Sequence, residues 1–178
     1  RGCRAAPPVP CSALALDVGR RRVGLAGCDP LGLTVTPLPV LRRGAFDQDV
    51  SSVSRLVRER SVRVIVVGLP LDRDQRTTRQ AVHCRRYGWA LVRALARSSA
   101  GLSVAWVNEH SSSWDAAQRF GLHGDRTGRL DSAAAALLLE QWLREGPAAD
   151  PVAGAAIERR GEAEADPSCW QRPGFHEH

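Results

Sequence analysis

The sequence predicts an α/β fold in which helices flank a mixed sheet of five strands in the order 3-2-1-4-5. Residues 13–18 and 23–28 are two apolar segments joined by a Gly/Arg turn, which is typical of a strand hairpin. Residues 62–67 are nearly all β-branched, as in a strand buried on both faces. Apolar residues recur at the helical period in three further segments, at residues 47–60, 80–97 and 130–144.

The first three strands form an antiparallel meander. A turn at residues 29–32 separates the second strand from a third at residues 33–41. The third strand contains Pro37 and Pro39, and because proline cannot donate to a strand ladder, this strand belongs at the edge of the sheet.

The remaining strands are linked by helices and therefore run parallel to the first. The strand at residues 62–67 follows the first helix, and a fifth strand at residues 102–107 follows the second. Right-handed crossovers place strands one, four and five side by side, which completes the order 3-2-1-4-5. A short helix is predicted at residues 113–120, ahead of the last helix.

Charge divides the chain into a basic body and an acidic tail. All 25 residues counted as Lys or Arg are arginine. Up to position 146 the chain has 22 arginines and 13 acidic residues, and beyond it 3 arginines and 6 acidic residues. We predict a disordered segment at residues 1–12, one domain at 13–146 and a disordered acidic tail at 147–178. The basic body indicates an anionic partner, most simply nucleic acid.

Cysteine usage and hydropathy indicate the compartment. The five cysteines have neither metal-site spacing nor an even count, which favours reduced thiols and a cytoplasmic location. No stretch approaches the length of a membrane span.

Three acidic residues from distant parts of the chain are predicted to converge. Asp17 ends the first strand, Glu109 follows the fifth, and Asp131 opens the last helix. The carboxyl ends of parallel strands meet at one sheet edge, where ligands bind. Carboxylates suit Mg²⁺ or Mn²⁺, and two such ions can clamp a phosphodiester. The alternative is that each acid is separately solvated or caps a turn.

Basic residues near these acids are candidate contacts for substrate phosphates, because arginine binds phosphate through two parallel hydrogen bonds. The candidates are Arg20, Arg21, Arg22, Arg73, Arg76, Arg79, Arg129 and His110. For the first three, the alternative is an ordinary charged hairpin tip, and for His110 it is a structural role.

Four segments, at residues 16–19, 66–71, 107–113 and 128–134, resemble the bacterial YqgF family in order and spacing. The resemblance covers about residues 13–146 and implies an RNase H-like fold. It also implies a nuclease in which Asp17, Glu109 and Asp131 are catalytic and bind Mg²⁺ or Mn²⁺. One departure is His110, where the family usually has arginine.

The resemblance implies 5′-end processing of the 16S rRNA precursor, with ribosomal precursor particles as further partners. A Holliday junction resolvase acting on branched DNA is the alternative activity, and a non-catalytic RNA-binding module is the alternative class. A third class is a nucleotide-binding relative of sugar kinases and actin-type ATPases. That class needs a second, duplicated domain, for which this chain is too short.

Overall fold

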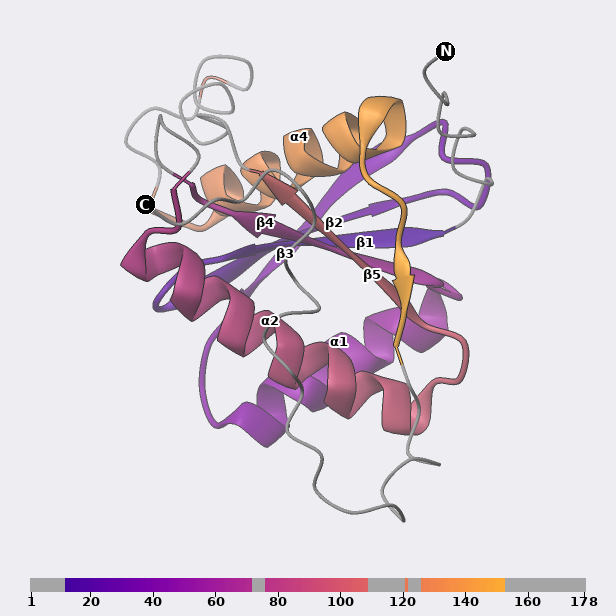
Figure 1. Cartoon of the computed structure of the whole chain (residues 1–178), viewed down its shortest axis with the longest axis horizontal. Coiled ribbons are helices and arrows are strands. Elements are labelled where there is room, and N and C mark those ends of the chain that lie inside the picture. The colour runs from indigo at the N-terminus through magenta and orange to yellow at the C-terminus, as the bar shows by residue number, and fades with distance from the viewer. Residues whose placement is uncertain (1–11, 72–75, 109–120, 122–125, 153–178) are drawn as a thin grey trace.

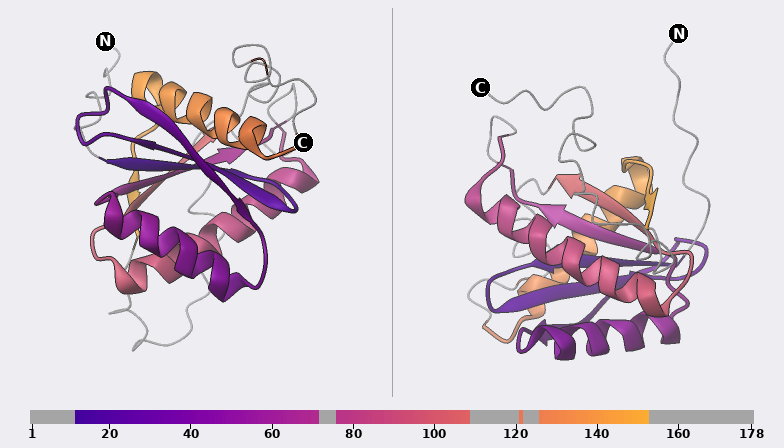
Figure 2. Two further views of the ribbon diagram at one scale, coloured as in Figure 1. Left: turned by 180° about the vertical axis from the view of Figure 1, so that it is seen from behind. Right: turned by 60° about the horizontal axis from the view of Figure 1, so that its bottom comes forward.

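The computed structural model describes residues 12–71, 76–108, 121 and 126–152, and its sheet has the order β3-β2-β1-β4-β5-β6. Helices α1 and α2 cover one face of the sheet and α4 crosses the other (Figures 1 and 2). The strands are β1 (Ala13–Val18), β2 (Arg22–Cys28), β3 (Val35–Arg42), β4 (Val64–Leu69), β5 (Ser103–Asn108) and β6 (Asp150–Pro151). The helices are α1 (Phe46–Glu59), α2 (Arg79–Ser98) and α4 (Arg129–Glu145).

The predicted order of the first five strands is confirmed. Strand β1 pairs antiparallel with β2 and parallel with β4, and β3 lies at the sheet edge as its two prolines require. The short strand β6 adds a sixth member beside β5, which the sequence did not predict. No described helix is both long enough and apolar enough to span a membrane.

Alternate residues of β1 enter two different cores. Leu14 and Leu16 belong to the core beneath α1 and α2, whereas Ala13 and Ala15 pack with Ala136 and its neighbours on α4. Side chains of a strand alternate between faces, so Asp17, two residues beyond Ala15, lies on the α4 side. Small residues on both elements let α4 approach the sheet closely.

Gly24 marks the closest approach of α4 to β2. A Cβ atom at this position would overlap the backbone carbonyl of Asp131 and lie 3.0 Å from the backbone nitrogen of Ser132. Gly24 is also the β2 partner of Asp17. Because Gly24 has no side chain, the first turn of α4 can lie directly over it, next to Asp17.

Strand β3 begins at Val35 rather than at residue 33 because Asp29 holds the preceding turn. Its carboxylate accepts hydrogen bonds from the backbone N–H groups of Leu33 and Thr34 at 2.7 and 2.6 Å. These N–H groups are therefore not available to pair with β2. Their hydrogen bonds, that of Thr34 above all, lower the pKa of Asp29.

Strand β4 begins at Val64 rather than at residue 62. The Val62 N–H donates to the carbonyl oxygen of Val57 at 2.9 Å, and Ser61 has a left-handed φ of 49°. These two residues close the end of α1, so they are not available to the strand. The predicted helix at residues 113–120 lies outside the described residues.

Tertiary contacts extend beyond the predicted domain limits of residues 13 and 146. The buried Ser12 hydroxyl donates to the carbonyl oxygen of Arg60 at 2.8 Å. The Val152 N–H donates to the carbonyl oxygen of Leu102 at 2.8 Å, and the Val152 side chain joins the core beneath α1 and α2. The predicted disorder of residues 1–11 and 153–178 lies outside the described part of the chain.

Candidate functional site

The structure brings Asp17 and Asp131 to the same face of the sheet at the carboxyl end of β1. Asp17 is half-buried and paired with Gly24, and the backbone at Asp131 packs directly over Gly24. Asp131 lies in the first turn of α4, where the helix dipole favours a negative charge. The backbone segments that carry two of the three predicted acids thus lie close together.

The third predicted acid, Glu109, lies outside the described residues, as do His110 and Arg73. The residue before Glu109, Asn108, ends β5 opposite Leu69, the last residue of β4. Within the described ranges, no three His, Cys, Asp or Glu side chains are grouped closely enough to hold a metal ion. The convergence of all three acids therefore stays a prediction.

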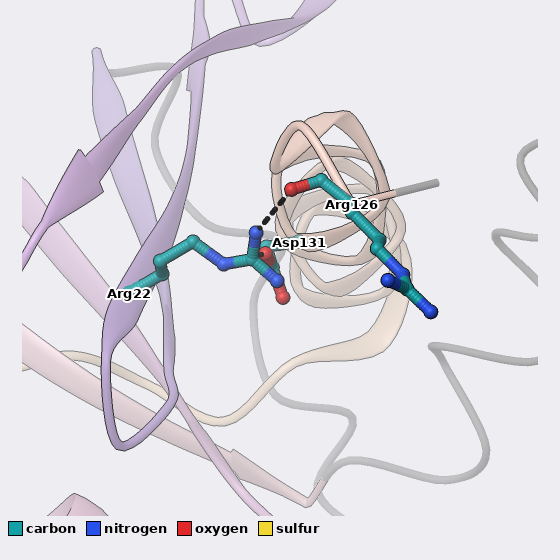
Figure 3. Close-up of polar contacts among 3 residues, drawn as sticks. All are labelled: Arg22, Arg126 and Asp131. Carbon is teal, nitrogen blue, oxygen red and sulfur yellow. Dashed lines mark hydrogen bonds and ion pairs between the residues drawn. The ribbon is translucent and has the colours of Figure 1, made fainter. Parts of the chain in front are cut away.

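Arg22, the first residue of β2, points toward α4 and pairs with Asp131 (Figure 3). Its Nε lies 3.0 Å from Asp131 Oδ2, and its Nη1 donates to the carbonyl oxygen of Arg126 at 2.7 Å. The guanidinium of Arg126 itself points away from this contact (Figure 3). Sequence analysis placed Arg22 among the candidate phosphate contacts, but it did not foresee its ion pair with an acid of the site.

The acid of α4 has the chemistry of a metal ligand. Asp131 Oδ2 is buried, and apart from the ion pair with Arg22 it has no hydrogen-bond partner among the described residues. A buried carboxylate oxygen is costly unless a cation lies against it, and here that cation is the Arg22 guanidinium. Carboxylate oxygens are the ligands that Mg²⁺ and Mn²⁺ prefer. The chemistry of Asp131 therefore suits a divalent ion.

The other described basic candidates surround this edge of the sheet. Arg20 and Arg21 form the exposed turn between β1 and β2, and Arg129 is the exposed first residue of α4. Arg76 and Arg79 are exposed at and just before the start of α2. The start of α2 reaches the end of β1, because the neighbouring side chain of Gln80 donates to the Val18 carbonyl oxygen at 3.4 Å.

Sequence analysis missed Arg43, which braces the β1–β2 turn from the other side. Its Nη1 donates to the carbonyl oxygens of Gly19 and Arg20 at 2.9 and 3.3 Å. The guanidinium also lies over the Tyr87 ring, 4.0 Å from the ring centroid, and contacts His83 Nε2 at 2.8 Å. No local pattern could have found Arg43, because each partner comes from another element.

A buried pair supports this brace. Asp49 is 2% exposed, and its Oδ2 accepts a hydrogen bond from the Tyr87 hydroxyl at 2.9 Å. Its Oδ1 accepts from the backbone N–H of Gly44 at 3.1 Å. Burial, followed by the bond to Asp49, raises the pKa of Tyr87 well above its ordinary value.

A groove of about 680 Å³ adjoins the site between β3 and the start of α4. Residues 37–40 form one wall, and residues 127–129 with Ser132 and Ala133 form the other. Gly128 caps α4 with a φ of 98°, and a Cβ atom there would overlap Val40. The groove is therefore continuous with the helix turn that carries Asp131.

Residues 11–145 match the family model described as "RuvX: Holliday junction resolvase". The chain belongs to the RuvX family. This confirms the resemblance to the YqgF family found in the sequence. The match includes every predicted site residue, from Asp17 to Asp131, and ends before β6.

Two curated relatives each match more than four-fifths of this RuvX-family chain. The protein named "Putative pre-16S rRNA nuclease" in Synechococcus sp. (strain CC9902) is 60% identical over 151 residues, which cover 85% of this chain and 89% of that protein. The protein of the same name in Parasynechococcus marenigrum (strain WH8102) is 61% identical over 83% of this chain and 90% of its own length.

Among solved structures, Thermus thermophilus RuvC in complex with a Holliday junction substrate matches this RuvX-family chain with a TM-score of 0.51. The match covers 80% of this chain and 99% of RuvC at 14% identity. This likeness shows the fold, which is the RNase H-like fold that the family resemblance predicted.

Proposed function

We propose that this chain is a metal-dependent endonuclease that hydrolyses phosphodiester bonds during 5′-end processing of the 16S rRNA precursor. The observation that carries the proposal is that Asp17 and the backbone of Asp131 both adjoin Gly24 on one sheet face, in a chain 60% identical to a protein named "Putative pre-16S rRNA nuclease". Its partners are the precursor rRNA and ribosomal precursor particles, and its place is the cytoplasm.

Asp17 and Asp131 would hold Mg²⁺ or Mn²⁺, and the family resemblance adds Glu109. A divalent ion supplies an activated water and stabilises the charge on the leaving oxygen. The carboxylates would ligate the ion, and the close packing of the Asp131 backbone on β2 fixes where one of them begins. Acids from β1 and α4 then act as one unit.

Exposed arginines bind and position the backbone of the substrate. Arg20, Arg21 and Arg129 lie on the segments that carry or adjoin the two acids, so their guanidinium groups can reach phosphates beside the scissile one. We propose the same role for Arg73, Arg76, Arg79 and His110. Phosphate contacts of this kind set affinity rather than sequence preference.

The groove beside the site provides a path for the strand next to the cleaved bond. Pro37 and Pro39 contribute an apolar wall that suits a sugar or base face, and Arg129 lies at the opening on the α4 side. A single strand combines such apolar contacts with charge neutralisation of its phosphates. We propose that one flank of the substrate lies here.

A four-way DNA junction is the second candidate substrate. The description of the matched family and the Holliday junction in the RuvC complex both favour it. Cleavage of a labelled precursor rRNA leader and of a junction, each with Mg²⁺, separates the two substrates. Preference for the junction over the leader would move the second candidate ahead.

Two variants test catalysis apart from binding. Asp17→Asn and Glu109→Gln keep side-chain size and remove a metal-ligating charge, so we expect both to abolish cleavage while RNA affinity by filter binding changes little. Arg76→Ala with Arg79→Ala should weaken binding and flatten its salt dependence by up to about two units of log–log slope. Parental cleavage by Glu109→Gln would show that Glu109 is not catalytic, whereas RNA binding without cleavage by the parent would favour the non-catalytic RNA-binding module.

Metal binding has its own measurement, independent of cleavage. Mn²⁺ at about 100 times its dissociation constant should stabilise the folded protein by about 2.7 kcal/mol. Asp131→Asn removes one ligand, so we expect its thermal unfolding to show a much smaller Mn²⁺ shift. An equal shift in this variant would show that Asp131 does not belong to the metal site.

A further inference from the structure

Arg22 occupies the position that a cation at Asp131 would need. Its guanidinium makes two contacts: the ion pair from Nε to Asp131 Oδ2 at 3.0 Å and the hydrogen bond from Nη1 to the Arg126 carbonyl at 2.7 Å (Figure 3). Both side chains of the pair are about one-third exposed, 34% for Arg22 and 32% for Asp131. The two contacts thus fix the position of the Arg22 guanidinium, while solvent still reaches both side chains.

The strand register keeps Arg22 at the site. Val23 belongs to the core beneath α1 and α2, so its neighbours Arg22 and Gly24 lie on the α4 side of β2. Gly24 is paired with Asp17 and packs beneath Asp131. Arg22 therefore reaches Asp131 from β2, the strand that also carries Gly24.

The Asp131 carboxylate has one positive neighbour, and a second cation at the same oxygen would compete with it for the negative charge. Oδ2 is buried, and among the described residues only Arg22 compensates its charge. A divalent ion bound to this oxygen would repel the guanidinium, since like charges in contact destabilise each other. Binding of the metal and retention of the ion pair therefore weaken one another.

We propose that Arg22 is the counter-ion of Asp131 in the absence of metal and exchanges places with the divalent ion. In the metal-free protein it neutralises Asp131 and keeps α4 seated on the sheet. When the ion binds, the guanidinium is released toward the substrate, where its planar fork suits a phosphate. This inference rests on the proposed metal-dependent function and assigns Arg22 as a positioning residue for it.

The test measures Mn²⁺ affinity of the full chain by isothermal titration calorimetry, with Arg22→Gln as the variant. Removing the competing charge should tighten Mn²⁺ binding about fivefold, the equivalent of a partly exposed ion pair. The metal-free variant should also unfold at a lower temperature than the parent. Removal of a positive charge elsewhere on the sheet should have a smaller effect on Mn²⁺ affinity.

Arg42→Gln is the matched control. Arg42 is exposed on β3 and is the register partner of Arg22, so this variant removes the same formal charge from the neighbouring strand. Its Mn²⁺ affinity should change by less than about twofold, as for an exposed charge without a direct partner. Equal tightening in Arg22→Gln and Arg42→Gln, or none in either, would overturn the exchange.

A measurement on the unaltered protein covers the case in which Arg22→Gln does not fold. The nitrogen-15 signal of Arg22 Nε, assigned with Arg22→Lys, should shift when diamagnetic Mg²⁺ is titrated. A signal unmoved at saturating Mg²⁺ overturns the exchange while leaving the metal site intact. A parent protein that binds neither ion overturns the metal dependence of the proposed function together with this inference.

Discussion

Replacing Gly24 by alanine tests whether the close approach of α4 to β2 creates the site. The new methyl group would overlap the backbone carbonyl of Asp131 and lie 3.0 Å from the Ser132 nitrogen, inside ordinary contact, which begins at 3.4 Å. Both obstacles are backbone atoms, so no side-chain rotation can relieve them. The first turn of α4 must withdraw from the sheet.

Withdrawal of α4 costs packing as well as position. Ala135, Ala136 and Leu139 lie at most 1% exposed against the sheet, and a shift of their helix loosens contacts with Ala15 on β1. Overpacking of a close-packed interface costs about 1–3 kcal/mol. For a chain of this size, that corresponds to a fall in melting temperature of about 3–10 °C.

The assay is thermal unfolding followed by circular dichroism, with and without Mn²⁺. We expect Gly24→Ala to melt lower and to lose most of the Mn²⁺ shift, because Asp131 moves away from Asp17. Gly44→Ala is the control, since its new methyl group meets only the flexible end of Gln48, at 3.1 Å. A Gly24→Ala protein that melts with the parent and keeps the Mn²⁺ shift would refute the close-approach argument.

Three further predictions concern stability. Tyr87 is the only tyrosine of the chain, and its pKa is raised in the folded state, so tyrosinate absorbance should appear at higher pH in folded than in urea-unfolded protein. The stability linked to this pKa is complete below the unfolded pKa of about 10 and is lost as pH rises above it. Truncation after Gly146 should melt below truncation after Val152, because only the longer chain keeps β6 and its bond to β5's neighbour Leu102, and equal melting temperatures would contradict this. Thr78→Ala should lower the free energy of unfolding by about 1 kcal/mol in urea titration, since the Thr78 hydroxyl accepts the Ala81 N–H at 3.0 Å and caps α2; an unchanged midpoint would show that the cap contributes nothing.

The sequence by itself determined the order of the first five strands and the face on which Asp17 lies. Both follow from local rules: strand alternation separates Asp17 from Leu16, and right-handed crossovers leave few ways to join helix-linked strands. Small residues on α4 and β1 let the helix pack closely on the strand, and Ala136 lies in one core with Ala13 and Ala15. The order and spacing of four short segments led to the family, which the comparisons show.

Only the tertiary structure decided which side chains compensate the charge of Asp131 and brace the β1–β2 turn. The ion pair of Arg22 with Asp131 joins residues more than a hundred positions apart, and the brace from Arg43 to Gly19 depends on where α2 places Tyr87. Strand β6 was missed for a related reason, because two residues carry no periodicity and pair only where β5 leaves an edge open. Side-chain direction, loop closure and edge pairing are set by packing between distant elements, and local sequence patterns do not encode them.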